Sequence, residues 1–194
     1  MAITTEDVKK LRDQTGVSIM QCKQALEEAS GDMEQALMLL RKKGSAIAAK
    51  KSDRELGAGV AATYLHGNKE IAVSVILQCE TDFVSKNEDF SALAYDIAMQ
   101  IAATNPLYTK REDLPEDEME KIKAMFADDV AGKPENLHEQ ILSGKIDSYL
   151  KGVVLLEQDF IKDTDRTVKD LISDATQKFG ERIEIGQFSR LSVK

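Results

Sequence analysis

The chain has 194 residues, of which 42% are hydrophobic and 31% charged, so it has the composition of an ordinary globular protein and the length to bury a core. The formal net charge is −8, and residues 56–194 carry sixteen basic and twenty-five acidic side chains. Because neutralising phosphates needs clustered Lys and Arg, this balance argues against direct nucleic-acid binding. No apolar run approaches the roughly 20 residues of a membrane span, and the first residues show no apolar signal core. We therefore expect a cytoplasmic protein without a membrane partner.

Few residues are available for covalent or metal chemistry. Cys22 and Cys79 lie far apart in apolar surroundings, and only two histidines are present, so no disulfide framework or zinc pattern is seen. The segment Gly57-Ala58-Gly59 lacks the third glycine of a phosphate-binding loop and precedes an expected strand. We expect no metal site and no cofactor.

The N-terminal segment is predicted to form three short helices. Side chains that favour helix starts alternate with glycines that favour helix ends, and the intervening apolar residues have helical spacing. The turns are short, so the helices should pack as one compact module. The expected helices run from Thr4 or Thr5 to Gly16, from Ser18 to Gly31 and from Asp32 to Gly44.

The next segment changes to strand periodicity. Alternating apolar residues up to Tyr64, a two-residue loop at Gly67-Asn68 and an apolar run from Ile71 to Cys79 predict a β-hairpin. The second strand is apolar at nearly every position, which favours a central strand or one covered on both faces. A third strand is expected within residues 182–193.

Helical patterns fill the rest of the chain. The strongest begins after Asn87 and ends at Asn105-Pro106. The fold class is therefore α+β: a helical module (1–45), a linker (46–55) and a core (56–194) with a small antiparallel sheet of about three strands, covered by helices on one face. Further helices are expected from Pro115 to about Gly132, from Pro134 with a break at Gly144 and a second part through Tyr149–Leu156, and from Thr164–Thr167 to Gly180.

Three features leave alternatives open. Ile19 and Met20 begin the second helix at an exposed turn, where apolar residues either staple the helix to the core or form a docking surface. Phe83, next to Asp82 in the connection after the second strand, either folds into the core or points outward as a charged, aromatic-tipped wedge. Cys79 could pair with a histidine as a nucleophile, but a buried small hydrophobic side chain fits its apolar strand better.

Three separated stretches carry a resemblance that covers essentially the whole chain. They are VKKLR…TG…MQCKQAL…GD from Val8 to Asp32, CETDFV from Cys79 to Val84, and VVLLEQ from Val153 to Gln158. In this order they resemble bacterial translation elongation factor Ts. The resemblance implies that the N-terminal module is similar to ubiquitin-associated (UBA) domains.

The resemblance further implies a guanine-nucleotide exchange factor, without a catalytic site of its own, acting in translation elongation. Such a factor binds elongation factor Tu in its GDP-bound and nucleotide-free states, and promotes GDP release by displacing Mg²⁺ and disturbing the phosphate site. By motif, the residues implied in Mg²⁺ dislocation are Thr81, Asp82, Phe83 and Val84. Those implied in docking the helical module and linker are Arg12, Ile19, Met20, Lys23 and Lys51.

The chain also departs from longer family members, because it shows one sheet-containing core where they carry two. A short form could recover the missing contact as a non-covalent homodimer in a two-plus-two complex, with residues 182–193 and 149–156 as candidate dimer surfaces. Two other functions remain open at this stage. One is an adaptor that binds another protein through the UBA-like module, and the other is an enzyme that uses Cys79.

Overall fold

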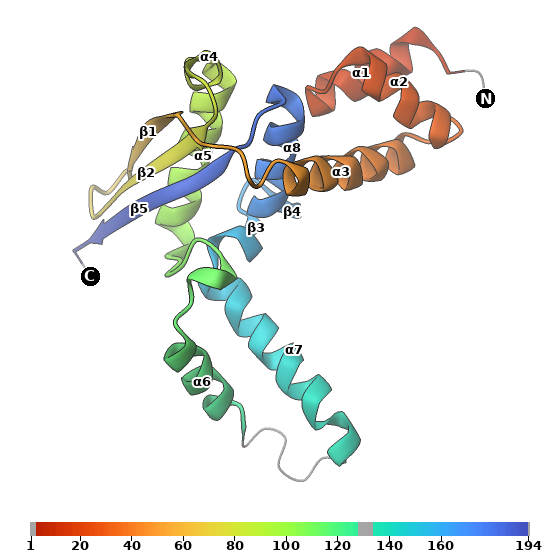
Figure 1. Ribbon diagram of the computed structural model, residues 1–194. Helices are drawn as coiled ribbons and strands as arrows, with labels where there is room; N and C mark the ends of the chain where they lie inside the picture. Colours follow the sequence, from red (N-terminus) through yellow and green to blue (C-terminus); the bar gives the residue numbers. More distant parts are fainter. Residues whose placement is uncertain (1–2, 128–133, 194) are drawn as a thin grey trace. The chain divides into compact units, whose positions relative to one another are not determined.

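The computed structural model describes residues 3–127 and 134–193, and its elements are shown in Figure 1. The chain forms two compact units. Unit 1 comprises Met1–Ala62, Ile76–Tyr95 and Lys169–Gly186, and unit 2 comprises Thr63–Val75, Asp96–Val168 and Gln187–Lys194. Unit 1 thus contains the N-terminal helices together with one end of the sheet. The domain boundaries expected at residues 45 and 55 stay a prediction.

The three N-terminal helices are α1 (Thr5–Thr15), α2 (Ile19–Glu28) and α3 (Met33–Lys50). Their predicted starts are confirmed, because the side chains of Thr4, Ser18 and Asp32 each accept a hydrogen bond from a backbone N–H in the first turn. Gly16 ends α1 in the left-handed conformation, at φ 67°. One apolar cluster joins the three helices: Val8, Leu11, Val17, Cys22, Ala25, Leu26, Ala29, Ala36 and Leu40.

The predicted end of the third helix at Gly44 is wrong, since α3 continues to Lys50. Gly44 is buried, and a Cβ atom at this position would lie 2.9 Å from Gln177 Oε1 and 3.4 Å from the Ser173 carbonyl oxygen. The missing side chain therefore permits a close approach between α3 and the helix that carries Ser173 and Gln177. The glycine serves packing here and does not terminate the helix.

The main sheet has three strands, β1 (Ala58–Leu65), β2 (Ile71–Cys79) and β5 (Glu184–Ser192), in the order β1-β2-β5. The prediction of a small antiparallel sheet with a central second strand is confirmed. The two-residue loop is wrong: the His66 N–H donates to the Ile71 carbonyl at 2.9 Å, which leaves residues 67–70 in the turn. Lys69 takes a positive φ of 61° there, so the turn is wider than Gly67-Asn68 suggested.

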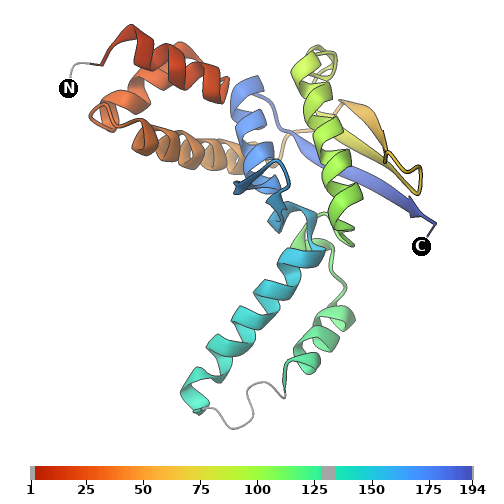
Figure 2. The ribbon, with the colours of Figure 1, turned by 180° about the vertical axis from the view of Figure 1, so that it is seen from behind.

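Three helices adjoin strands of the sheet in the chain: the short α4 (Asp82–Ser85) and α5 (Glu88–Thr104) follow β2, and α8 (Val168–Phe179) precedes β5. Helix α5 lies behind the sheet in Figure 1 and in front of it in Figure 2, so it covers one face. The Phe90 and Phe179 rings meet edge to face with centroids 5.9 Å apart, which joins α5 to α8 in unit 1. The predicted start of the last helix at residues 164–167 is wrong, because these residues belong to a strand.

That strand is part of a two-stranded ribbon in unit 2, formed by β3 (Asp159–Phe160) and β4 (Asp163–Thr167). The ribbon is held by the buried side chains of Gln100 and Gln158. Gln100 Nε2 donates to Gln158 Oε1 and to the Asp159 carbonyl, while Gln100 Oε1 accepts from the Ile161 N–H. The ribbon was not expected from the sequence.

Helices α6 (Glu116–Met125) and α7 (Glu135–Val153) share a small apolar cluster around Ile122, Leu150 and Val154. The expected break at Gly144 is wrong, because α7 runs through this glycine, which faces open space. Helix α6 ends at Met125, and its expected end at Gly132 lies outside the described residues. Two 3₁₀ turns, η1 (Arg111–Asp113) and η3 (Leu155–Glu157), flank the pair, and the Arg111 guanidinium binds both Glu157 carboxylate oxygens at 2.7 Å.

Candidate functional site: an exposed loop and a helical groove

The connection between β2 and α5 presents an aromatic side chain to solvent. We call residues 80–85 the Phe83 loop. Phe83 sits on the single turn of α4 and is 83% exposed, so the alternative in which it folds into the core is wrong. Because burying a phenylalanine is favourable, a ring left in solvent is available for contact with another molecule.

Asp82 precedes the ring and is also exposed. Lys86 Nζ donates to Asp82 Oδ2 at 2.6 Å, one helical turn away. This hydrogen bond, together with the charge of Lys86, lowers the pKa of the Asp82 carboxyl below its usual value of 3.8. The carboxylate is therefore ionised at neutral pH, next to an apolar tip.

The base of the Phe83 loop is hydrogen-bonded to a segment a hundred residues away in the chain. Glu181 Oε2 accepts from the backbone N–H groups of Glu80 and Thr81 at 3.1 and 3.0 Å, and Glu181 Oε1 accepts from the Thr81 hydroxyl at 2.5 Å. The sequence reasoning missed Glu181, which is one of 34 acidic residues and has no distinguishing local pattern.

In the opposite direction, the Glu80 side chain binds the residue that follows Glu181. Its Oε1 accepts from the Arg182 backbone N–H at 2.6 Å, and Arg54 Nη1 binds its Oε2 at 3.1 Å. The Arg182 amide, followed by Arg54, lowers the pKa of Glu80 below its usual value of 4.5. The two carboxylates at the base of the loop are thus stabilised by hydrogen bonds: Glu181 by two amides and a hydroxyl, and Glu80 by an amide and the Arg54 guanidinium.

Val84 in the loop and Cys79 just before it are buried. Val84 is only 3% exposed, so the free protein buries it, and its implied contact with a partner stays a prediction. Cys79 is fully buried, as expected from its strand, and its thiol donates to the Thr81 carbonyl at 3.2 Å. Burial raises the pKa of this thiol, which makes it a poor nucleophile at neutral pH.

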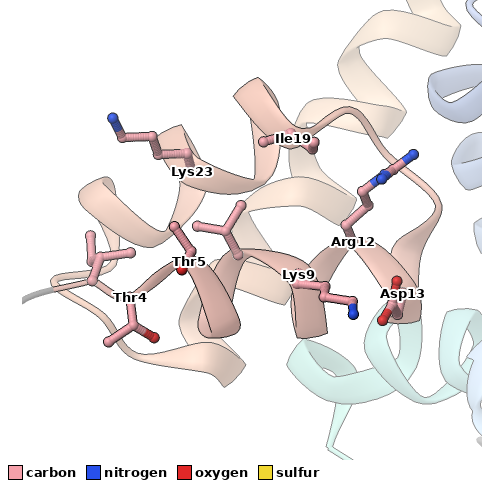
Figure 3. Close-up of a pocket in the computed structure, with 9 residues that line it drawn as sticks. Thr4, Thr5, Lys9, Arg12, Asp13, Ile19 and Lys23 are labelled. Carbon is pink, nitrogen blue, oxygen red and sulfur yellow. The ribbon is translucent and has the colours of Figure 1, made fainter.

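A second surface lies on the helical module. An open groove of about 510 Å³ runs between α1 and α2, as Figure 3 shows. Arg12, Ile19 and Lys23, all named from the sequence, line it. Basic groups on an apolar groove suit a helix that carries acidic side chains. The full lining is Ile3, Thr4, Thr5, Val8, Lys9, Arg12, Asp13, Ile19 and Lys23.

Ile19 and Met20 are 58% and 80% exposed, so the alternative in which they staple α2 to the core is not what the structure shows. Met20 neighbours the groove in sequence without lining it. Lys51, the candidate in the linker, donates from Nζ to the Gly180 carbonyl. The nine named residues therefore occupy three places in unit 1: the groove together with Met20 beside it in sequence, the Phe83 loop, and the end of α3.

Within the described part of the chain, no group of three or more His, Cys, Asp and Glu side chains is placed to hold a metal ion. Likewise, no helix among residues 3–127 and 134–193 is long and apolar enough to cross a membrane.

Comparison with known proteins gives one consistent result. The sequence profile of the family described as Elongation factor TS matches residues 4–194. The chain is 48% identical to an elongation factor Ts of Maridesulfovibrio salexigens, over 100% of this chain and 95% of that protein. It is 45% identical to the elongation factor Ts of Thermotoga petrophila, over 100% of this chain and 97% of that protein. It is 48% identical to the elongation factor Ts of Carboxydothermus hydrogenoformans, over 98% of this chain and 89% of that protein.

Proposed function

This chain belongs to the elongation factor Ts family, and on that basis we propose that it is a guanine-nucleotide exchange factor for elongation factor Tu. Apart from the family relationship, the observation that best supports the proposal is the exposed Phe83 side chain. It lies on a loop whose base is hydrogen-bonded to Glu181 and Arg182. An ordered apolar tip is suited to insertion between elements of a partner. Buried aromatic anchors of this kind dominate the energy of many protein interfaces.

The proposed mechanism acts on the partner's Mg²⁺ and phosphate site. The divalent ion is a large local charge that stabilises the diphosphate, so moving the elements that hold it weakens GDP binding. Phe83 would occupy an apolar site that opens in the displaced state. Because a binder shifts an equilibrium only by its differential affinity, this contact must be made in the displaced state and not in the GDP-bound one. GDP and the exchange factor then weaken each other's binding by the same factor.

Asp82 supplies the charged part of the contact. In the free protein it is paired with Lys86 on an exposed surface, where such ion pairs contribute little free energy. Exchanging this partner for a cation or helix N-terminus of elongation factor Tu therefore has a small energetic penalty. The Lys86 pairing keeps the carboxylate oriented at the loop tip until the partner arrives.

The groove between α1 and α2 is proposed as the docking site that brings the Phe83 loop to the partner. Its apolar floor and its lysine and arginine side chains would suit an amphipathic helix with acidic side chains on the nucleotide domain of that partner. Met20, which follows the groove residue Ile19 in sequence, adds an exposed and adaptable apolar side chain.

We further propose that the protein acts as a non-covalent homodimer in a two-plus-two complex. In support, β5 is an edge strand, and Leu191 and Val193 at its end are exposed. An unpaired strand edge is a ready surface for pairing with a second copy. Sedimentation equilibrium would give twice the chain mass of 21.5 kDa. A single 21.5 kDa species at micromolar concentration would contradict the dimer.

The exchange activity is tested by stopped-flow release of a fluorescent GDP from purified elongation factor Tu. Wild type should accelerate release strongly, and Phe83→Ala should lose most of that acceleration while staying folded. Leu107→Ala is the matched control, since Leu107 is also a large exposed apolar residue but lies in unit 2. Met20→Ala should raise the concentration of factor needed for half-maximal rate, because Met20 is assigned to docking.

The same assay separates the alternative adaptor function. An adaptor that binds another protein through the UBA-like module would leave GDP release unchanged with every variant. In that case the groove around Ile19 would carry all binding, and the Phe83 loop would be dispensable. A folded wild type that fails to accelerate release would overturn the exchange function.

A further inference from the structure

We propose that Glu181 is the positioning residue of the Phe83 loop, so that its carboxylate, remote in sequence, sets how effectively Phe83 drives nucleotide release. This inference rests on the proposed exchange function. Glu181 does not touch the partner in this account. It acts by fixing the start of α4, where the loop leaves the end of β2.

The Phe83 loop needs such support because its own helix is very short. Helix α4 has only four residues, and one isolated helical turn is unstable in water. Its N-cap residue Thr81 makes no side-chain capping hydrogen bond within α4. The Thr81 hydroxyl instead donates to Glu181 Oε1 at 2.5 Å. Glu181 therefore fixes the residue that directly precedes the turn, from another segment of the chain.

Both oxygens of Glu181 are engaged in this contact. Oε2 accepts from two successive backbone N–H groups, those of Glu80 and Thr81, while Oε1 accepts from the hydroxyl. Hydrogen bonds to a charged acceptor are stronger than neutral ones. A glutamine at this position would keep one acceptor oxygen but would turn an NH₂ group toward a donor. The three donors therefore specify a carboxylate.

The segment around Glu181 also contacts the linker of the helical module. The neighbouring Gly180 carbonyl accepts from Lys51 Nζ, and the Arg182 guanidinium donates to the Arg54 carbonyl. Residues 180–182 thus bind the base of the Phe83 loop and the end of α3 at once, all within unit 1. The loop tip is held on a fixed base. An exposed ring that is held in this way spends less conformational entropy on insertion than a freely moving one.

The test measures GDP release from elongation factor Tu with Glu181→Ala and Glu181→Gln. Glu120→Ala is the matched control, since Glu120 is exposed on α6. We expect the maximal release rate to fall about tenfold with Glu181→Ala and less with Glu181→Gln. The concentration for half-maximal rate should change much less, because the groove is untouched. A rise in that concentration at an unchanged maximal rate would overturn the inference.

A double substitution distinguishes positioning from general destabilisation. If Glu181 acts through Phe83, then Glu181→Ala should reduce the rate by less than about twofold in a Phe83→Ala background. If the two substitutions reduced the release rate by factors that multiply in the double variant, Glu181 would act elsewhere and the inference would be overturned. Amide hydrogen exchange gives a second readout. The Glu80 and Thr81 amides should exchange faster in Glu181→Ala, while buried α8 amides such as that of Leu171 keep their protection.

The failure of this inference differs from that of the proposed function. Acceleration by wild type that is lost in Phe83→Ala but kept in Glu181→Ala would overturn the role of Glu181 alone. No acceleration by folded wild type would overturn the exchange function and this inference together.

Discussion

The buried glutamine pair of unit 2 offers a quantitative test of the fold. Gln158 is 5% exposed and makes three side-chain hydrogen bonds: its Oε1 accepts from Gln100 Nε2 at 3.2 Å and from the Thr104 hydroxyl at 2.7 Å, and its Nε2 donates to the Gly152 carbonyl at 2.9 Å. Gln158→Leu keeps a similar volume and removes all three bonds, so the lost free energy is mainly that of hydrogen bonding.

The magnitude follows from the bonds that are lost. The single Thr104 hydroxyl proton can turn to the Gln100 carbonyl, so two bonds are lost net, and at about 1 kcal/mol for each net hydrogen bond they give about 2 kcal/mol of lost stability. Both donors keep a second acceptor, because Gln100 Nε2 also reaches the Asp159 carbonyl and the Thr104 hydroxyl also reaches the Gln100 carbonyl. This retained bonding prevents the larger penalty of orphaned donors. Since Gln158 anchors the β3–β4 ribbon, the loss should appear as a lower free energy of unfolding.

Urea unfolding followed by circular dichroism measures this change. The control is Gln187→Leu, since Gln187 is exposed on β5, and its effect should stay within about 0.5 kcal/mol. A loss of less than about 1 kcal/mol for Gln158→Leu would refute the reasoning that the network is buried and satisfied.

Three further predictions concern unit 1. The lowered pKa of Glu80 means that its contribution to stability is present above pH 4.5 and is lost as pH falls through the lowered value. Urea unfolding of wild type and Glu80→Gln should therefore differ at pH 7 and converge in acid, below the lowered pKa of Glu80, and a difference that persists there would contradict this sign. The buried Cys79 thiol should resist iodoacetamide in the native state and react once urea unfolds the chain, whereas rapid native labelling would contradict its burial. A Cβ on Gly59 would lie 2.6 Å from the Leu77 carbonyl oxygen, so Gly59→Ala should lower the free energy of unfolding by about 1–3 kcal/mol. A Cβ on Gly67 meets nothing within 4 Å, so Gly67→Ala should leave the free energy of unfolding nearly unchanged. If urea unfolding showed equal losses of stability for Gly59→Ala and Gly67→Ala, the contact with Leu77 would be contradicted.

The helices with clear caps and the sheet could be predicted from the sequence because their signals are local. The caps at Thr4, Ser18 and Asp32, the alternation in β1 and the apolar run in β2 depend on neighbours a few residues apart. The predicted helix ends at two glycines were wrong because a glycine ends a helix only where nothing else supports the helix. Gly44 lies against Gln177, and Gly144 lies in a helix of 19 residues that continues through it.

The residues of the candidate site also differ in whether the sequence could reveal them. Ile19, Met20, Asp82 and Phe83 stood out in the sequence as residues at exposed turns, whereas the resemblance was needed to name the others. The exposure of Phe83 contradicts the general tendency to bury phenylalanine. Glu181 could not be found, because its partners are the backbone of residues 80 and 81, about a hundred positions away. Backbone partners leave no trace in the sequence. The short β3–β4 ribbon was missed because DTDRT carries no alternating apolar pattern.

The central claim is that the Phe83 loop releases GDP by acting on the partner's Mg²⁺ and phosphate site. The most direct measurement is the rate of fluorescent GDP release by wild type and Phe83→Ala, each with Mg²⁺ present and with Mg²⁺ chelated. The account predicts that the ratio of the two rates is large with Mg²⁺ and shrinks on chelation, because the ion that the loop displaces is already gone. An equal ratio in both conditions would contradict the claim.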